Sequence, residues 1–207
     1  MEPARQELTT EIRWIRQGRL GDDVRAWFAR LAPVLETRED DYLITPAMPG
    51  LSVKIRGGSS FDVKQHQGAV AALDIPAGGA GRIDSWLKFS FPLSGGADLP
   101  QVADASGWRQ VRKRRQICVF PAADARRQAD SPHRNGCSVE LTEVQALGDA
   151  WWTLGFEARG RGALGGIKRA AAIVFGEAPP MIPAFEAEEA MSYSAWINEL
   201  VMERADE

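Results

Sequence analysis

Apolar and polar residues alternate along several stretches of the chain, a pattern typical of β-strands with one apolar face. The clearest case is the stretch GLSVKIRGGSSFDVKQHQG, residues 50–68, in which two alternating runs flank a Gly-Gly-Ser-Ser turn. Its polar face would carry Lys54, Arg56, Asp62, Lys64 and His66, and its apolar face Val53, Ile55, Phe61 and Val63. The pattern predicts a β-hairpin that gathers its charges on one side.

Six further stretches read as strands, which makes eight predicted strands with those of the hairpin. They lie at residues 9–16, 38–46, 82–91, 108–120, 137–144 and 151–160. Apolar residues at helical spacing predict a helix that ends at Pro33 and two more over residues 165–177 and 184–207. Residues 69–81, 95–106 and 122–136 are expected to be loops. Without a repeat or a shift in composition, residues 1–207 are expected to form one domain.

Composition narrows the class of protein. The 207 residues are 44% hydrophobic and 26% charged, and no apolar run approaches the roughly 18 residues that span a bilayer. We therefore expect a cytoplasmic protein with no membrane association. Its two cysteines, Cys118 and Cys137, do not form a metal-ligand pattern, and two histidines give little material for a zinc site or a Ser-His-Asp triad.

Positive charge is concentrated locally although the net charge is −3. The run WRQVRKRR, residues 108–115, holds five cations and no acid. Nucleic-acid binding is one interpretation, but it usually accompanies a basic total charge, so we do not expect a nucleic-acid partner.

The charged strand faces have two interpretations. They are solvated in an open sheet, whereas in a closed barrel they line the interior while the apolar faces pack on helices. An interior that gathered these cations would repel itself when empty and would need an anion, for which phosphate is the common case. The predicted phosphate-binding residues are Lys54, Arg56, Lys64, Lys88, Lys113 and Arg115.

Three glutamates on predicted strands are candidate metal ligands, namely Glu11, Glu140 and Glu157. Carboxylates beside phosphates are the usual way to hold Mg²⁺ or Mn²⁺, because these hard cations prefer oxygen ligands. The alternative is that the three glutamates form ion pairs with the cations of the interior.

The order of these motifs resembles the CYTH superfamily, the triphosphate tunnel metalloenzymes. TEIRW is similar to the acidic first strand of that family, DYLITP to its Tyr-x-Asp-Thr-Pro strand, and LSVKIRGG and FDVKQ to its paired basic strands. VRKRR is similar to the Lys-x-Arg strand, with Lys113 and Arg115 as the matching pair. VELTEV and LGFEA are similar to the two late acidic strands, and SYSAWI to the Ser-Tyr motif of the terminal helix.

The resemblance implies an α+β fold, an eight-stranded antiparallel closed tunnel barrel with flanking helices. It also implies a metal-dependent phosphohydrolase that acts on inorganic triphosphate, thiamine triphosphate or a nucleoside triphosphate. The partner would be a small-molecule triphosphate or another polyanion. Basic residues would hold the phosphates and the glutamates would hold Mg²⁺ or Mn²⁺.

Four positions depart from the family pattern. Arg13 replaces the second Glu of the first strand, Ile15 its Lys, Thr142 an expected Asp, and Gly155 the first Glu of the last Glu-x-Glu. Fewer carboxylates weaken divalent-metal binding, and Arg13 would repel the ion while offering phosphate an extra contact. The alternative function is therefore a non-catalytic nucleotide- or polyphosphate-binding protein. The sequence leaves the organic part of the ligand and the oligomeric state open.

Overall fold

The computed structural model describes residues 4–75, 78–93, 107–121, 136–160, 162–176 and 183–205. Within these residues the chain forms eight strands, three α-helices and one short 3-10 turn, Ala187–Glu189. The strands are β1 (Arg5–Gln17), β2 (Val34–Leu43), β3 (Leu51–Arg56), β4 (Ser60–Ile75), β5 (Gly79–Pro92), β6 (Trp108–Pro121), β7 (Gly136–Ala146) and β8 (Asp149–Arg159). The helices are α1 (Asp22–Ala29), α2 (Ala163–Gly176) and α3 (Tyr193–Ala205).

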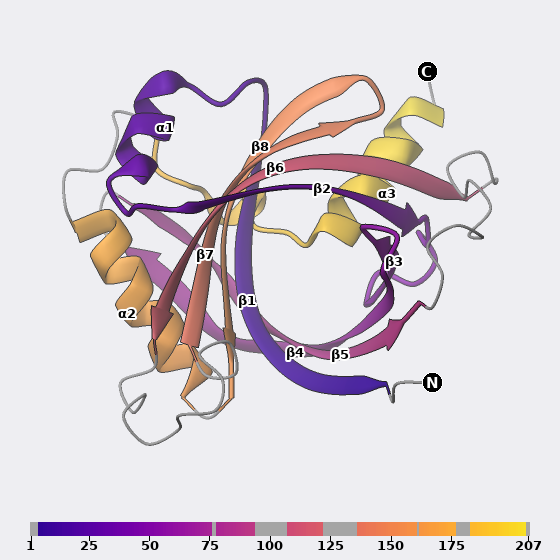
Figure 1. The fold of residues 1–207 in the computed structure, drawn as a ribbon, viewed down its shortest axis with the longest axis horizontal. Helices are drawn as coiled ribbons and strands as arrows, with labels where there is room; N and C mark the ends of the chain where they lie inside the picture. The colour runs from indigo at the N-terminus through magenta and orange to yellow at the C-terminus, as the bar shows by residue number, and fades with distance from the viewer. Residues whose placement is uncertain are drawn as a thin grey trace.

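The strands close into an antiparallel barrel in the order β1-β5-β4-β3-β2-β6-β7-β8 (Figure 1). Strand β1 completes the ring because it pairs with β5 on one side and with β8 on the other. The predicted α+β fold with a closed eight-stranded barrel and flanking helices is thus confirmed. The Gly-Gly turn between β3 and β4 is also present, with Gly57 and Gly58 at φ values of 52° and 66° that favour glycine.

Three predicted elements need correction. Residues 69–75 and 79–81 are not a loop but belong to β4 and β5, which pair as far as Ile75 and Gly79, and Gly79 allows Phe185 to approach the backbone closely. A Cβ on Gly79 would lie 2.8 Å from the Cβ of Phe185. Strand β2 begins at Val34 rather than 38, and α3 covers only the second half of the predicted helix over residues 184–207. The predicted loop over residues 95–106 lies outside the described residues, as does that over 122–136 except for its last residue.

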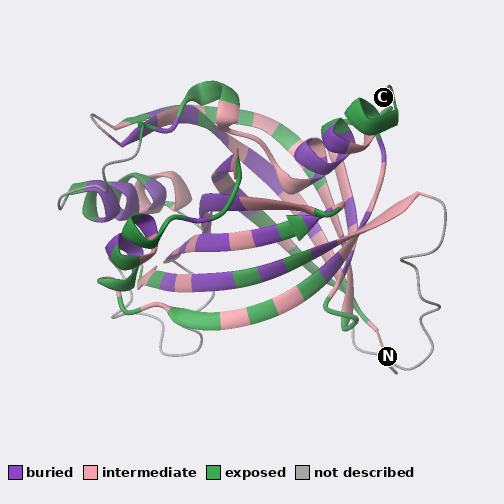
Figure 2. Cartoon of the chain, turned by 90° about the horizontal axis from the view of Figure 1, so that it is seen from above, coloured by how far each residue is buried: buried purple, intermediate pink, exposed green. Residues whose placement is uncertain are grey.

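The main apolar core lies outside the barrel, between its wall and helices α1 and α2. Outward residues of β1 and β8, such as Trp14 and Phe156, are fully buried there with Ile167 and Phe175 of α2. Trp14 meets the rings of Phe156 and Phe175 edge-on, with ring centres 6.2 and 6.5 Å away. Figure 2 shows the result as buried and more exposed positions that alternate along the strands. The apolar faces of these strands therefore point out of the barrel.

A second apolar cluster fills one end of the barrel. Ile15 and Val111 face the same side of their strands as Arg13 and Lys113, and both pack with Trp196, Ile197 and other residues of α3. Helix α3 thus closes the interior at this end and leaves its middle polar. Among the described helices, none is both long and apolar enough to cross a membrane.

Candidate functional site

The barrel encloses a cavity of about 100 Å³, here called the tunnel cavity. All ten residues that the sequence predicts as a site line it: Glu11, Arg13, Lys54, Arg56, Lys64, Lys88, Lys113, Arg115, Glu140 and Glu157. They come from β1 and β3 to β8, and they meet because alternate residues of each strand share its inner face. The charged face of the hairpin formed by β3 and β4 therefore points into the barrel.

The sequence interpretation missed two further charged lining residues, Arg38 and Arg159, and it placed Asp62 on the correct face without including it in the site. Tyr42, Tyr193, Ser192 and Ser194 also contribute to the lining. Arg38, Asp40 and Tyr42 are alternate residues of β2 and so share one strand face. The alternation Arg-x-Asp-x-Tyr was therefore the signal that could have found Arg38 and Tyr42. Arg159 likewise lies two residues after Glu157 on β8.

Asp40 lies behind the cavity wall and binds three of its cations. The side chain is fully buried, and its carboxylate lies 2.8 Å from Lys113 Nζ, 3.1 Å from Lys54 Nζ and 2.9 Å from Arg38 Nε. Burial alone would raise the pKa of Asp40, but Lys113, Lys54 and Arg38 outweigh burial and hold it well below its usual range. One buried carboxylate thus anchors one wall of the site.

Burial lowers the pKa of several cavity lysines because it disfavours the ammonium form. The pKa of Lys54 falls to about 8 although Asp40 opposes the shift, and the pKa of Lys113 falls well below its usual value. Burial also lowers the pKa of Lys88, whose main partner is Asp62 at 3.3 Å. The carboxylates of the chain therefore compensate these cations only in part.

Glu11 and Glu157 are cross-strand neighbours that share one lysine. They are register partners on β1 and β8, and Lys64 Nζ lies 2.6 Å from Glu11 and 3.4 Å from Glu157. Glu157 also accepts a hydrogen bond of 2.7 Å from Arg159. Burial would raise the pKa of Glu157, but Lys64 and Arg159 lower it well below its ordinary value. Both carboxylates are thus already paired with cations of the chain.

Glu140 is held by two arginines. It accepts hydrogen bonds from both Nε and Nη2 of Arg115, and Arg13 Nη2 lies 3.7 Å away. Burial would raise the pKa of Glu140, but Arg13 and Arg115 together lower it. The ion pairs that the sequence left as an alternative role are therefore present for all three glutamates.

The donor set does not fit a metal site made by the protein alone. Among the described residues, no three acidic, histidine or cysteine side chains gather closely enough to hold a metal ion. Glu11, Glu140 and Glu157 each face an ammonium or guanidinium group where an ion would have to lie. The expected Mg²⁺ or Mn²⁺ stays a prediction from the family resemblance.

Positive charge dominates the tunnel cavity. Its nine lining cations come from seven strands: Arg13, Arg38, Lys54, Arg56, Lys64, Lys88, Lys113, Arg115 and Arg159. Seven carboxylates oppose them, which are the four that line the cavity, the buried Asp40, Glu36 beside Arg115 and Arg38, and Glu7 beside Arg159. Arg56 forms no salt bridge with any described residue. The cavity therefore carries an excess of positive charge.

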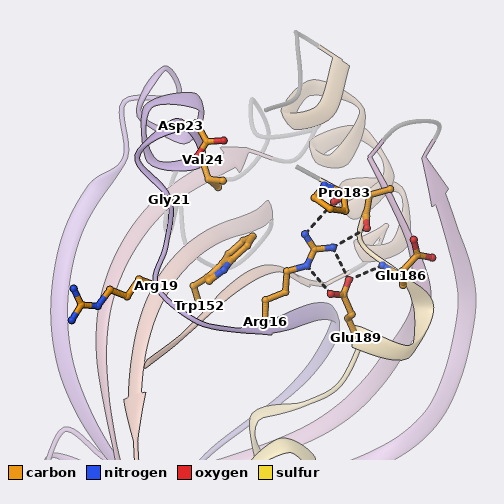
Figure 3. A pocket seen from close by; sticks show the side chains of 10 residues that line it. Arg16, Arg19, Gly21, Asp23, Val24, Trp152, Pro183, Glu186 and Glu189 are labelled. Atoms are coloured by element: carbon orange, nitrogen blue, oxygen red, sulfur yellow. Dashed lines mark hydrogen bonds and ion pairs between the residues drawn. The ribbon is translucent and has the colours of Figure 1, made fainter. Parts of the chain in front are cut away.

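A second hollow of about 490 Å³ lies outside the barrel (Figure 3). Its central side chain is Arg16, which donates hydrogen bonds to Glu189 and to the carbonyl oxygens of Pro183 and Ala184. The guanidinium group also lies 4.4 Å from the ring centre of Phe185. These contacts fasten the segment before α3 to β1, so Arg16 has a structural role.

Comparison with known proteins adds little to this picture. The chain matches no family model and no curated protein. Among solved structures it is similar to the protein HpAC1 from Hippeastrum, described as an adenylyl cyclase candidate with a dominant triphosphatase activity. That similarity has a TM-score of 0.44 at 9% sequence identity and covers 82% of this chain and 88% of the other. The barrel assignment rests on the strand pairing of this chain itself.

Proposed function

We propose that the tunnel cavity binds a small molecule through its triphosphate group. The observation that carries this proposal is the convergence of nine cations from seven strands on one cavity with seven opposing carboxylates. Like charges a few ångströms apart repel by about 4 kcal/mol per pair at an effective dielectric constant near 20. A bound polyanion removes that repulsion and supplies the missing partners.

The depressed lysine pKa values support the same function. Burial lowers the pKa of Lys54, Lys88 and Lys113 because it disfavours their ammonium forms. Phosphate oxygens in contact with these groups would favour the charged forms again. Binding energy is therefore available for a multiply charged ligand in particular.

The spread of donors favours a chain of phosphates over a single carboxylate. The cations extend around the barrel from Lys54 and Lys113, which share Asp40 near α3, to Arg159, which donates to Glu157. The hydroxyls of Tyr193 and Ser192 add neutral hydrogen-bonding groups near α3. The sequence resemblance to triphosphate tunnel enzymes supports the same ligand class.

Hydrolysis of the bound triphosphate with Mg²⁺ or Mn²⁺ is the second candidate function. The observation that favours it is the adjacency of Glu11 and Glu157, which are register partners inside the cavity. Mg²⁺ is often held by one or two carboxylates together with substrate phosphates. Lys64 would first have to leave these two carboxylates, since it forms an ion pair with each of them.

The experiment that separates the two functions combines binding with phosphate release. Purified protein is given inorganic triphosphate, ATP and thiamine triphosphate with Mg²⁺, with Mn²⁺ and with EDTA, and both the melting temperature and released phosphate are measured. The proposal predicts that triphosphate raises the melting temperature. Metal-dependent release that Glu157→Gln abolishes would establish the hydrolase. If none of the three compounds raises the melting temperature and none releases phosphate, both functions are refuted.

A further inference from the structure

Arg13 occupies a space that the backbone of β8 keeps open for it. Its register partner on β8 is Gly155, and a Cβ built on Gly155 would lie 2.6 Å from Arg13 Cζ and 2.7 and 2.8 Å from Nη1 and Nη2. Contacts below 3.0 Å essentially never occur for a real Cβ. Any side chain at position 155 would therefore displace the guanidinium group.

The guanidinium group is held in place from several sides. Arg13 Nη1 donates a 3.0 Å hydrogen bond to Thr153 Oγ1, and Cζ lies 4.5 Å from the ring centre of Tyr193. The Tyr193 hydroxyl lies 3.0 Å from the same Thr153 oxygen, and the Arg13 carbonyl accepts a 2.9 Å hydrogen bond from the Met191 backbone. These contacts fix both the ring and the arginine beneath it.

Arg13 nevertheless keeps most of its donors free. A guanidinium group has five N–H donors, and among the described residues only the bond to Thr153 uses one. Its side chain retains 14% of its exposure and lines the tunnel cavity. A phosphate in the cavity could therefore take two donors at once, which is the geometry that guanidinium groups favour.

The position of Arg13 is surrounded by the three predicted metal ligands. Glu11 precedes it by two residues on β1, Glu157 is the register partner of Glu11, and Glu140 is the partner of Gly155 on the other side of β8. Arg13 Nη2 lies 3.7 Å from Glu140. A metal ion held by these carboxylates would lie beside a fixed positive charge.

We propose that Arg13 is the fixed cation of the tunnel cavity, so that triphosphate binds without a divalent ion, and that Gly155 is glycine to make room for it. This inference rests on the proposed triphosphate binding and goes further by naming which cation replaces the metal. It departs from the metal dependence that the family resemblance implies. Arg13 would contact a phosphate directly and hold that phosphate in the same position whether or not Mg²⁺ is present.

The test is calorimetric titration of the full chain with inorganic triphosphate in EDTA and again with Mg²⁺. The wild type should bind in EDTA, and Mg²⁺ should not tighten binding. Arg13→Gln should weaken binding by tenfold or more, since a charge-assisted hydrogen bond contributes about 10-fold to 100-fold. Gly155→Ala keeps every charge but displaces the guanidinium group, so it should weaken binding in the same way.

The matched control is Arg114→Gln, which removes one positive charge from the outer face of β6. The Arg114 side chain is 66% exposed, so this variant should bind within about twofold of the wild type. Melting temperatures of all variants show whether each one folds. Should neither cavity variant fold, the wild-type titrations alone still decide whether binding needs a metal.

Two results would overturn the inference while leaving triphosphate binding intact. One is a wild type that binds triphosphate only with Mg²⁺. The other is a pair of folded variants, Arg13→Gln and Gly155→Ala, that bind as tightly as the wild type. A wild type that binds in neither condition would instead refute the proposed function itself, and the inference with it.

Discussion

The two faces of strand β8 follow opposite rules although they alternate residue by residue. On the outer face, Leu154 and Phe156 are fully buried among apolar side chains of the main core. On the inner face, Gly155 makes room for an arginine and Glu157 is held between Lys64 and Arg159. The outer face provides stability, whereas the inner face assembles charges that only a ligand would fully satisfy. Substitutions should therefore separate stability from binding according to the face they change.

The largest expected effect is on the outer face. Phe156→Ala should lower the free energy of unfolding by about 3–5 kcal/mol, because it leaves a cavity between Trp14 and Phe175. Urea unfolding, monitored through tryptophan fluorescence, measures this change in the free energy of unfolding. Triphosphate affinity of the folded variant should be unchanged. As a control, Phe91→Ala removes a ring that is 42% exposed and should cost less than about 1.5 kcal/mol. Equal costs at the two positions would contradict the assignment of the core.

The next effect is on the inner face, at its buried anchor. Asp40→Asn removes the charge that compensates Lys54, Lys113 and Arg38, and it should destabilise the empty protein by about 3 kcal/mol. Triphosphate should restore part of this loss, because it offers the same cations a new partner. The melting temperature with and without triphosphate measures both effects.

The neighbouring Asp41 provides the control for this variant. It points to the other face of β2, and burial, with help from Asp40 and Glu39, raises its pKa. Asp41→Asn should therefore be neutral or slightly stabilising. If it were as harmful as Asp40→Asn, the effect could not be attributed to the cavity cations.

A smaller effect is expected at Arg56, where a substitution should weaken triphosphate binding without lowering stability. Arg56 lines the cavity without a salt bridge to any described residue, so Arg56→Gln should leave the melting temperature unchanged or raise it. Triphosphate affinity should fall about tenfold, because one charged donor is lost. Arg112→Gln, on the outer face of β6 and 62% exposed, is the control. Unchanged affinity in Arg56→Gln would show that this end of the cavity does not contact the ligand.

The smallest effect concerns pH. Burial lowers the pKa of Lys54 to about 8 from its ordinary 10.5, with Arg38 and Arg56 acting in the same direction and Asp40 against it. Between these values the unfolded chain binds more protons than the folded one, so the stability of the empty protein should rise with pH there. Triphosphate affinity should instead fall above about pH 8, by at most about tenfold per pH unit for one proton.

Titrations at several pH values test this dependence, with Lys54→Met as the reference. Ionisation of triphosphate itself contributes equally to both proteins, so the difference between their slopes isolates Lys54. Identical slopes would show that Lys54 does not change its protonation when the ligand binds.

The alternation of residues was enough to predict the barrel wall, because strand period and face are local properties. Val53 and Lys54 fall on opposite faces whatever their partners are. The partners themselves were not predictable, because they depend on register between strands far apart in the chain. Lys64 meets Glu11 and Glu157 only because β4, β1 and β8 come together around the barrel. Alternation places Asp40 on one strand face with Arg38 and Tyr42, but it does not show that Lys54 and Lys113 meet Asp40 there.

The relation between Arg13 and Gly155 shows the same limit at the centre of the site. The sequence shows both residues as departures from the family pattern, on strands about 140 residues apart. It does not show that the guanidinium group fills the space above the glycine, which follows from the pairing of β1 with β8. Two apparent losses of acidic residues are one structural arrangement.

The most direct test of the account is calorimetric titration of the wild-type protein with inorganic triphosphate, beside Lys113→Met and Phe156→Ala. The account predicts saturable binding of one triphosphate per chain, lost or strongly weakened in Lys113→Met and retained by folded Phe156→Ala. No heat of binding by the wild type, with or without a divalent ion, would contradict the claim that the inner face of the barrel is a polyanion site.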